Sequence, residues 1–97
     1  MQINSWGSVQ DWSPPLKNIS CKTININMRN DLDWEILNKG ISIFVNRGIL
    51  SILIENEFTK NIKIKKIKNG ESFHLSKNIN HKYSADTGDV SFVKIIS

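Results

Sequence analysis

The strongest constraint on this chain is a two-residue alternation of apolar and polar side chains through most of its length. Successive side chains of a β-strand point to opposite faces of the sheet, so this period is typical of strands with one buried face. Apolar residues at helical spacing are nearly absent, and β-branched residues, which favour strands, dominate. The alternating apolar positions are Ile24, Ile26, Met28, Leu32, Trp34, Ile36, Ile41, Ile43, Val45, Leu50, Ile52, Ile54, Ile62, Ile64, Phe73, Leu75, Val90 and Phe92.

Short polar segments separate these apolar runs and predict turns. They are Ser13–Pro15, Arg29–Asp31, Asn38–Gly40, Asn46–Gly48, Glu55–Glu57, Asn69–Gly70, Ser76–Asn78 and Asp86–Asp89. Short strands at intervals of roughly 8–12 residues indicate an all-β sandwich or barrel. A chain of 97 residues has room for one core, so we expect a single domain over residues 1–97.

The first 15 residues have no clear strand pattern, and we interpret them as an N-terminal arm. Trp6 and Trp12 favour docking of this arm on the barrel or on a partner subunit over disorder. An all-β chain of this size leaves strand edges exposed, and dimerisation is one way to cover them. We therefore expect a homodimer.

Composition narrows the class of protein further. The single cysteine, Cys21, excludes an intramolecular disulfide and zinc sites built from several cysteines. No apolar run approaches the roughly 20 residues of a membrane helix, and the N-terminus lacks the features of a signal peptide. We expect a cytoplasmic protein without membrane partners. The net charge of +4 favours an anionic ligand.

The positive charge is concentrated between Lys60 and Lys68. A nucleic-acid interface is one interpretation of this segment, and a solvated strand face is the favoured one, because lysines discourage edge-to-edge pairing of strands. Proteins that bind single strands usually add exposed aromatic residues for base stacking. Only Phe58 is available nearby, so nucleic acid is not the expected partner.

The segment Gly70–Tyr83 resembles the second sequence motif of the cupins. That motif is a glycine, five residues, a proline, one residue, a glycine, two residues and a histidine. The same spacing leads here from Gly70 to His81, with Ser76 in the proline place and Asn78 in the second glycine place. Asn tolerates a left-handed turn conformation better than most residues.

Two further segments carry the same resemblance. Ile43–Gly48 is similar to the end of the first cupin motif. Trp6-Gly7 resembles a dipeptide near the start of cupins related to mannose-6-phosphate isomerase and mannose-1-phosphate guanylyltransferase. The resemblance covers most of the chain. It implies a cupin-like double-stranded β-helix, which is a jelly-roll barrel.

The resemblance also implies where a metal ion would be bound. Counted back from Gly48, with the histidine of the second motif, the ligand positions are Glu35, Leu37, Ile41 and His81. Leu and Ile cannot bind a cation, and two protein ligands leave a divalent ion mostly to water. We therefore expect no tightly bound metal and no cofactor.

The two histidines are expected on opposite faces of their sheet. His81 takes the inward position that the resemblance implies, and Tyr83, two residues further on, shares its face. His74 lies between Phe73 and Leu75, so it points outward if those two are core residues. His81 is a candidate for acid–base catalysis or for ligand hydrogen bonding. The structural alternative is an imidazole hydrogen-bonded inside the barrel mouth.

Glu35 and Trp34 complete the candidate set. A buried base at Glu35 is weighed against an outward carboxylate, which the alternation favours. Trp34 is a candidate platform for sugar stacking, although a core position is favoured. The candidate ligand-binding residues are His81, Tyr83, Glu35 and Trp34, and His81 is the catalytic candidate.

Three functions stay open at this point. The favoured one is a metal-free barrel that binds a small molecule in its mouth or serves as a dimeric scaffold. The expected ligand is an anionic sugar, such as a sugar phosphate. The second is isomerisation or epimerisation of a sugar phosphate or nucleotide sugar, with His81 as acid and base. The third is single-strand nucleic-acid binding by the lysines between Lys60 and Lys68. Whether the chain is an enzyme is left open.

Overall fold

The strands follow the alternation of the sequence. In β5 (Ile41–Arg47), Ile41, Ile43 and Val45 are buried and the residues between them are exposed. The computed structural model describes residues 1–15 and 18–97. This part of the chain forms ten strands, so it offers no helix that could cross a membrane. The expected all-β class is confirmed.

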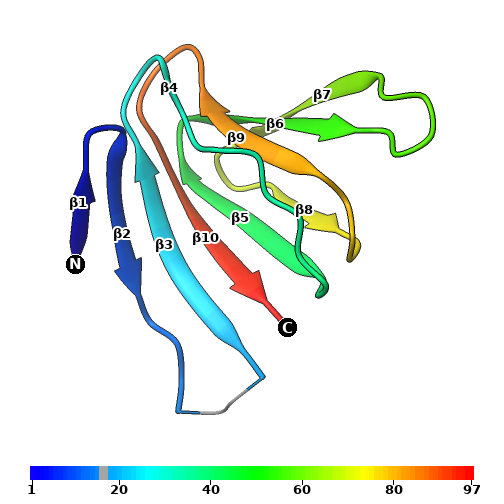
Figure 1. Cartoon of the computed structure of the whole chain (residues 1–97). Helices are drawn as coiled ribbons and strands as arrows, with labels where there is room; N and C mark the ends of the chain where they lie inside the picture. Colours follow the sequence, from blue (N-terminus) through cyan, green and yellow to red (C-terminus); the bar gives the residue numbers. More distant parts are fainter. Residues whose placement is uncertain (16–17) are drawn as a thin grey trace.

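The ten strands form two antiparallel sheets that enclose one core (Figure 1). The larger sheet contains, in spatial order, β1 (Gln2–Asn4), β2 (Gly7–Asp11), β3 (Ser20–Ile26), β10 (Val90–Ile96), β5 and β8 (Ser72–Leu75). The smaller sheet contains β4 (Asn30–Asp31), β9 (His81–Ala85), β6 (Ile49–Glu55) and β7 (Ile62–Lys68).

Inward side chains of both sheets make up the core. The buried apolar residues are Ile24, Ile26, Ile41, Ile43, Val45, Leu50, Ile52, Ile67, Leu75, Tyr83, Ala85, Val90 and Phe92. Most are positions of the predicted apolar alternation, so burial of apolar area, at about 25 cal/mol per Å², is the main force that selects this register.

The N-terminal segment extends the larger sheet. β1 pairs with β2, and β2 pairs with β3 from Gly7 opposite Ile26 to Asp11 opposite Lys22. Trp6 packs against the core, while Trp12 is 62% exposed and donates from Nε1 to Thr23. A Cβ at position 7 would collide with the backbone carbonyl of Asn25. The Trp6-Gly7 dipeptide thus has a packing role in this chain.

The turn before β9 has the expected conformation. Asn78 has a φ of 64°, in the left-handed region that Asn tolerates. In β8, Leu75 is buried and Phe73 packs against the core, as the alternation predicts. His74 lies between them, is exposed, and contacts Ser42 through Nδ1 at 3.2 Å. Its outward direction is therefore confirmed.

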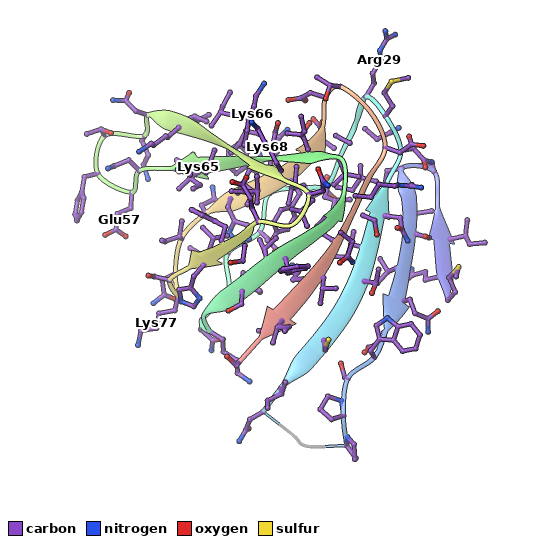
Figure 2. The ribbon with its side chains drawn as sticks, turned by 180° about the vertical axis from the view of Figure 1, so that it is seen from behind. Arg29, Glu57, Lys65, Lys66, Lys68 and Lys77 are labelled. Carbon is purple, nitrogen blue, oxygen red and sulfur yellow. The ribbon has the colours of Figure 1, made fainter. Side chains whose placement is uncertain are left out.

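The strand β7 differs from the expected pattern, because its alternating isoleucines are not buried. Ile62 and Ile64 are 53% and 56% exposed, and only Ile67 reaches the core. Ile62 and Ile64 pair with Glu55 and Leu53, which alternate with the inward Ile52 and Ile54, so these two isoleucines lie on the outer face of the sheet. The hairpin of β6 and β7 can be followed in Figure 1. Figure 2 labels Lys65, Lys66 and Lys68 of β7, all three of which are exposed.

Candidate functional site

Four polar side chains meet on the inner side of the barrel. They come from three segments: His81 and Tyr83 from β9, Lys94 from β10, and Glu35 from the connection between β4 and β5. His81, Tyr83 and Lys94 are 1%, 1% and 6% exposed. We call this group the Glu35 cluster. The expected inward direction of His81 and its shared face with Tyr83 are confirmed.

Backbone pairing brings Glu35 next to His81. The two residues form an isolated antiparallel bridge, in which the Glu35 amide donates to the His81 carbonyl at 2.8 Å and the reverse bond is 3.0 Å. Directly opposite residues of an antiparallel pair project to the same face. Glu35 therefore points inward with His81, and the expectation of an outward carboxylate is wrong.

A β-bulge is the reason for that error. The Leu32 amide donates to the Tyr83 carbonyl, and three residues later Glu35 pairs with His81, only two residues away on β9. One residue in the segment 33–34 is therefore extra, and such an insertion inverts the alternation that follows. Leu32 still packs against the core, whereas Ile36 is 60% exposed.

The bulge also places Trp34 outside the cluster. Trp34 is 38% exposed, and the Lys82 ammonium lies over its ring at 5.6 Å from the centroid. Lys82 alternates with His81 and Tyr83 along β9, so it belongs to the opposite face of the strand. The expected core position of Trp34 is wrong. The structure also does not bring this residue together with the other three candidates.

One oxygen of Glu35 receives all the contacts within the cluster. His81 Nε2 lies 2.9 Å from Oε1, the Tyr83 hydroxyl donates to Oε1 at 3.2 Å, and the Lys94 ammonium donates to the same atom. Oε2 receives none of these bonds. The Glu35 side chain is 30% exposed, so the cluster faces solvent through the carboxylate.

The protons of His81 follow from its partners. Nδ1 lies 2.8 Å from the Ile79 carbonyl, which can only accept, so Nδ1 carries a proton. Nε2 lies near both Glu35 and the Tyr83 hydroxyl, which is 3.1 Å away. A protonated Nε2 donates to Glu35, whereas an unprotonated Nε2 accepts from Tyr83.

Burial and charge act in opposite directions on the ionisable groups of the cluster. Burial alone raises the pKa of Glu35, but hydrogen bonds from His81 and Lys94 outweigh it and hold this pKa at about 2. Burial lowers the pKa of Lys94, and the Glu35 carboxylate opposes that shift. Burial and the Glu35 charge both raise the pKa of Tyr83. At neutral pH, Glu35 is thus an ionised acceptor and Tyr83 a neutral donor.

A row of charged residues continues from the cluster across the larger sheet. Asp11 of β2 pairs with Lys22 of β3, and Lys22 pairs with Lys94 of β10. Cross-strand partners share a face, so the three side chains lie side by side on the inner face of the sheet. We call Asp11, Lys22 and Lys94 the charged row. Sequence reasoning did not identify it, although Lys94 lies two residues after the buried Phe92.

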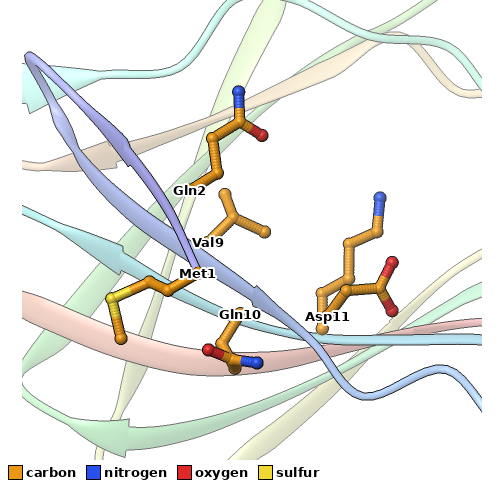
Figure 3. A pocket seen from close by; sticks show the side chains of 6 residues that line it. Met1, Gln2, Val9, Gln10 and Asp11 are labelled. Atoms are coloured by element: carbon orange, nitrogen blue, oxygen red, sulfur yellow. The ribbon is translucent and has the colours of Figure 1, made fainter.

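A hollow of about 390 Å³ opens beside the charged row. Its lining residues are Met1, Gln2, Val9, Gln10, Asp11 and Lys22. Figure 3 shows Gln2 and Val9 on one side of β1 and β2 and Met1 on the other. Met1, Gln2 and Asp11 of this lining are exposed, so the hollow is open to solvent. Two further hollows lie around Asn56, in the turn between β6 and β7.

The residues present do not fit a metal ion. Leu37 packs against the core and Ile41 is 1% exposed, so two of the four implied ligand positions are apolar. Within residues 1–15 and 18–97, no three His, Cys, Asp or Glu side chains are grouped as a metal site requires. The ammonium of Lys94 lies against Glu35, one of the two remaining ligands.

The lysines of β7 do not form a single surface. Lys63 and Lys65 pair with the inward Ile54 and Ile52, whereas Lys66 pairs with Ser51 on the opposite face. A groove that follows a nucleic-acid backbone needs its cations on one side. The geometry therefore does not favour a nucleic-acid interface on this strand.

Comparison with known proteins identifies the fold. No protein-family model and no curated protein matches the sequence. Among solved structures, a variant of the Bacillus subtilis oxalate decarboxylase matches with a TM-score of 0.87 and 11% identity over 99% of this chain and 26% of its own. Hydroxypropylphosphonic acid epoxidase from S. wedmorenis matches with a TM-score of 0.72 and 15% identity over 82% and 44%. An Fe(II) form of HppE matches with a TM-score of 0.71.

These neighbours have the cupin fold, so the chain has it as well. It spans about a quarter to less than half of their lengths. At 11–15% identity, the similarity extends to the fold alone. The cupin-like barrel implied by the sequence motifs is confirmed, whereas none of these neighbours is of the mannose-6-phosphate isomerase type.

Proposed function

We propose that this chain is a metal-free cupin-like barrel that binds a small anion beside the Glu35 cluster. The proposed ligand carries hydroxyl groups and belongs to the sugar phosphates. One observation carries the proposal: Lys22 lies beside Lys94 on the inner face and also lines a hollow. Like charges directly opposite one another destabilise a sheet, and a bound anion relieves that repulsion.

The carboxylate of Glu35 is the reason to propose a ligand that carries hydroxyl groups. Its Oε1 is occupied by the cluster, while Oε2 receives none of those bonds and the side chain is partly exposed. Because the pKa is about 2, the carboxylate remains an acceptor at physiological pH. A ligand hydroxyl is a suitable donor for it. The sugar class itself rests on the Trp6-Gly7 resemblance and on the net positive charge.

Isothermal titration calorimetry with mannose 6-phosphate and glucose 6-phosphate tests the proposal. We expect binding that weakens as salt rises, because the anion interacts with exposed charge. Lys22→Gln should weaken binding at least tenfold. Lys63→Gln, an equal loss of charge on the exposed strand β7, should leave it unchanged. Absence of binding by both sugar phosphates, or equal effects of the two variants, would contradict the proposal.

The acid–base alternative is less well supported by this geometry. A carboxylate with a pKa of about 2 is a weak base at neutral pH, and both ring nitrogens of His81 have partners. If the chain nevertheless isomerises a sugar phosphate, His81→Ala should abolish turnover. Ligand bound without turnover, seen by native mass spectrometry, distinguishes binding from catalysis.

We also propose that the chain forms a homodimer, because dimerisation would cover exposed strand edges. β7 and β8 are edge strands, and so is β1. Light scattering coupled to size-exclusion chromatography should give twice the mass of the chain. A monomer at micromolar concentrations would contradict this proposal without affecting the ligand site.

A further inference from the structure

Lys94 is an unusual residue for its position. The inward positions of β10 are Val90, Phe92, Lys94 and Ile96, and the first two are fully buried. Lysine is almost never buried unless it is paired, because burial removes water from its charge. Its ammonium is paired here with Glu35, and it lies 5.0 Å from the centroid of the Tyr83 ring. The aromatic face adds a second favourable contact for a cation.

The partners of Lys94 are residues at the implied metal position. Glu35 and His81 are the two polar residues among the four ligand positions that the cupin resemblance implies, and both contact one another. One structural neighbour was solved with Fe(II) and another with Co(II). The positive charge beside Glu35 and His81 comes here from the chain itself.

We propose that the Lys94 ammonium takes the place of a divalent cation in this barrel, satisfying Glu35 and excluding metal ions from the cluster. The geometry gives two reasons. His81 Nδ1 contacts the Ile79 carbonyl and Nε2 lies 2.9 Å from Oε1 of Glu35, so a metal ion bound by this imidazole would have to displace one of these contacts. A divalent ion at Glu35 would also lie close to a buried ammonium, and the two positive charges would repel each other strongly.

This inference does not depend on the proposed ligand. The proposed ligand site shares Lys94 and Glu35 with the cluster, but it also requires Lys22 and the hollow, which the exclusion of metal does not. The two proposals therefore fail separately: a chain that binds no sugar phosphate can still exclude metal, and the converse also holds.

Co²⁺ titration of three purified proteins, followed by visible absorption and calorimetry, tests the inference. The wild-type chain should show no cobalt binding up to about millimolar concentrations, the weak end of the affinity scale. Lys94→Met, which keeps a similar length without charge, should bind Co²⁺ at least tenfold more tightly. Lys22→Met removes a neighbouring charge that does not touch Glu35, and it should behave as the wild type. Stoichiometric cobalt in the wild type, or no gain in Lys94→Met, would overturn the inference.

A second measurement tests, without metal, whether the Lys94 ammonium is the counter-charge of Glu35. Glu35→Gln leaves the Lys94 ammonium without its carboxylate, so its urea midpoint should fall. The double variant Glu35→Gln with Lys94→Met removes the unmatched charge, and it should be more stable than Glu35→Gln alone. If the Lys94 ammonium does not interact with Glu35, the second substitution does not restore the urea midpoint, and the inference is wrong.

Discussion

The two faces of β9 carry polar clusters of opposite character. On the inner face, a single carboxylate, Glu35, accepts from Tyr83 and Lys94 and lies 2.9 Å from His81 Nε2. On the outer face, Ser84 lies between two carboxylates, 2.8 Å from Asp31 and 2.6 Å from Asp86. A hydroxyl has one proton, so it can donate to only one of them at a time. The inner cluster gathers its donors around one carboxylate, whereas the outer one has two carboxylates, with Ser51 donating to Asp86 at 2.9 Å and Lys82 donating to Asp31.

The serine donors of the outer face, Ser51 and Ser84, are also buried, but only the inner face buries a charged donor, Lys94, against a partly buried carboxylate. The inner donors are nearly inaccessible, so they need a protein partner to replace lost hydration. Asp31 has a side chain that is 49% exposed, and it is also paired with Lys82 at 3.1 Å. Lys82 at Asp31, and the Ser51 hydroxyl at Asp86, supply the hydrogen bonds that Ser84 cannot. Substitutions on the inner face should therefore cost far more stability than equivalent ones outside.

Glu35→Gln is the strongest test of this difference. It leaves the buried ammonium of Lys94 without a counter-charge, and breaking a buried ion pair in this way costs about 3–5 kcal/mol. Urea denaturation at pH 7 should show a loss in the free energy of unfolding toward that range. A loss below about 1 kcal/mol, the median for a surface pair, would mean that the inner cluster is effectively solvated.

Lowering the pH should gradually remove the stability that the ionised Glu35 contributes. The pKa of Glu35 is about 2 in the folded chain, below the ordinary value of 4.5. A lowered pKa gives stability that is complete above the unfolded value and is lost as pH falls through the folded one. The gap in stability between wild type and Glu35→Gln should thus narrow between pH 4.5 and 2. A gap that stays constant over this window would contradict the assignment.

Tyr83→Phe should have an intermediate effect. The ring remains packed against Phe92, at 5.1 Å between centroids, and only the hydroxyl that donates to Glu35 is lost. A typical hydrogen bond contributes about 0.5–1.5 kcal/mol, and the loss should fall in that range. Ser42→Ala, which removes an exposed hydroxyl contact with His74, is the matched control and should cost less.

Asp31→Asn should have the smallest effect. Exposed ion pairs typically contribute about 0–1 kcal/mol and are screened by salt. The change in the free energy of unfolding should stay below that limit and should diminish further at high salt. A loss comparable to that of Glu35→Gln would show that the two faces of β9 do not differ as proposed.

Much of the fold could be predicted from the sequence, because the core is built from a simple repeating pattern. Ile41, Ile43 and Val45 all lie inside as their spacing predicts, and Asn78 has the expected left-handed conformation. In these places each side chain has one favourable face, and burial of apolar area decides it. The inward position of His81 was predictable from its place in the motif.

The rest of the site was not predictable from alternation, for two physical reasons. The extra residue at 33–34 reverses the faces of Trp34 and Glu35, and the local sequence has no glycine to signal a bulge. Lys94 lies two residues after Phe92, so alternation places it inside, whereas its charge favours the surface. Its burial depends on the ion pair with Glu35, which the sequence does not reveal. The roles of His81, Tyr83 and Glu35 in ligand binding stay predictions.

The bulge between Leu32 and Glu35 also has a genetic consequence. Gaining or losing one codon in this short stretch, with the pairing of β4 unchanged, exchanges which of the following side chains face the interior. No amino acid beyond that point has to be replaced. In an edge segment of this kind, one insertion or deletion can change which side chains line the interior of the barrel. The hydrogen-bonded strands of the core keep their register.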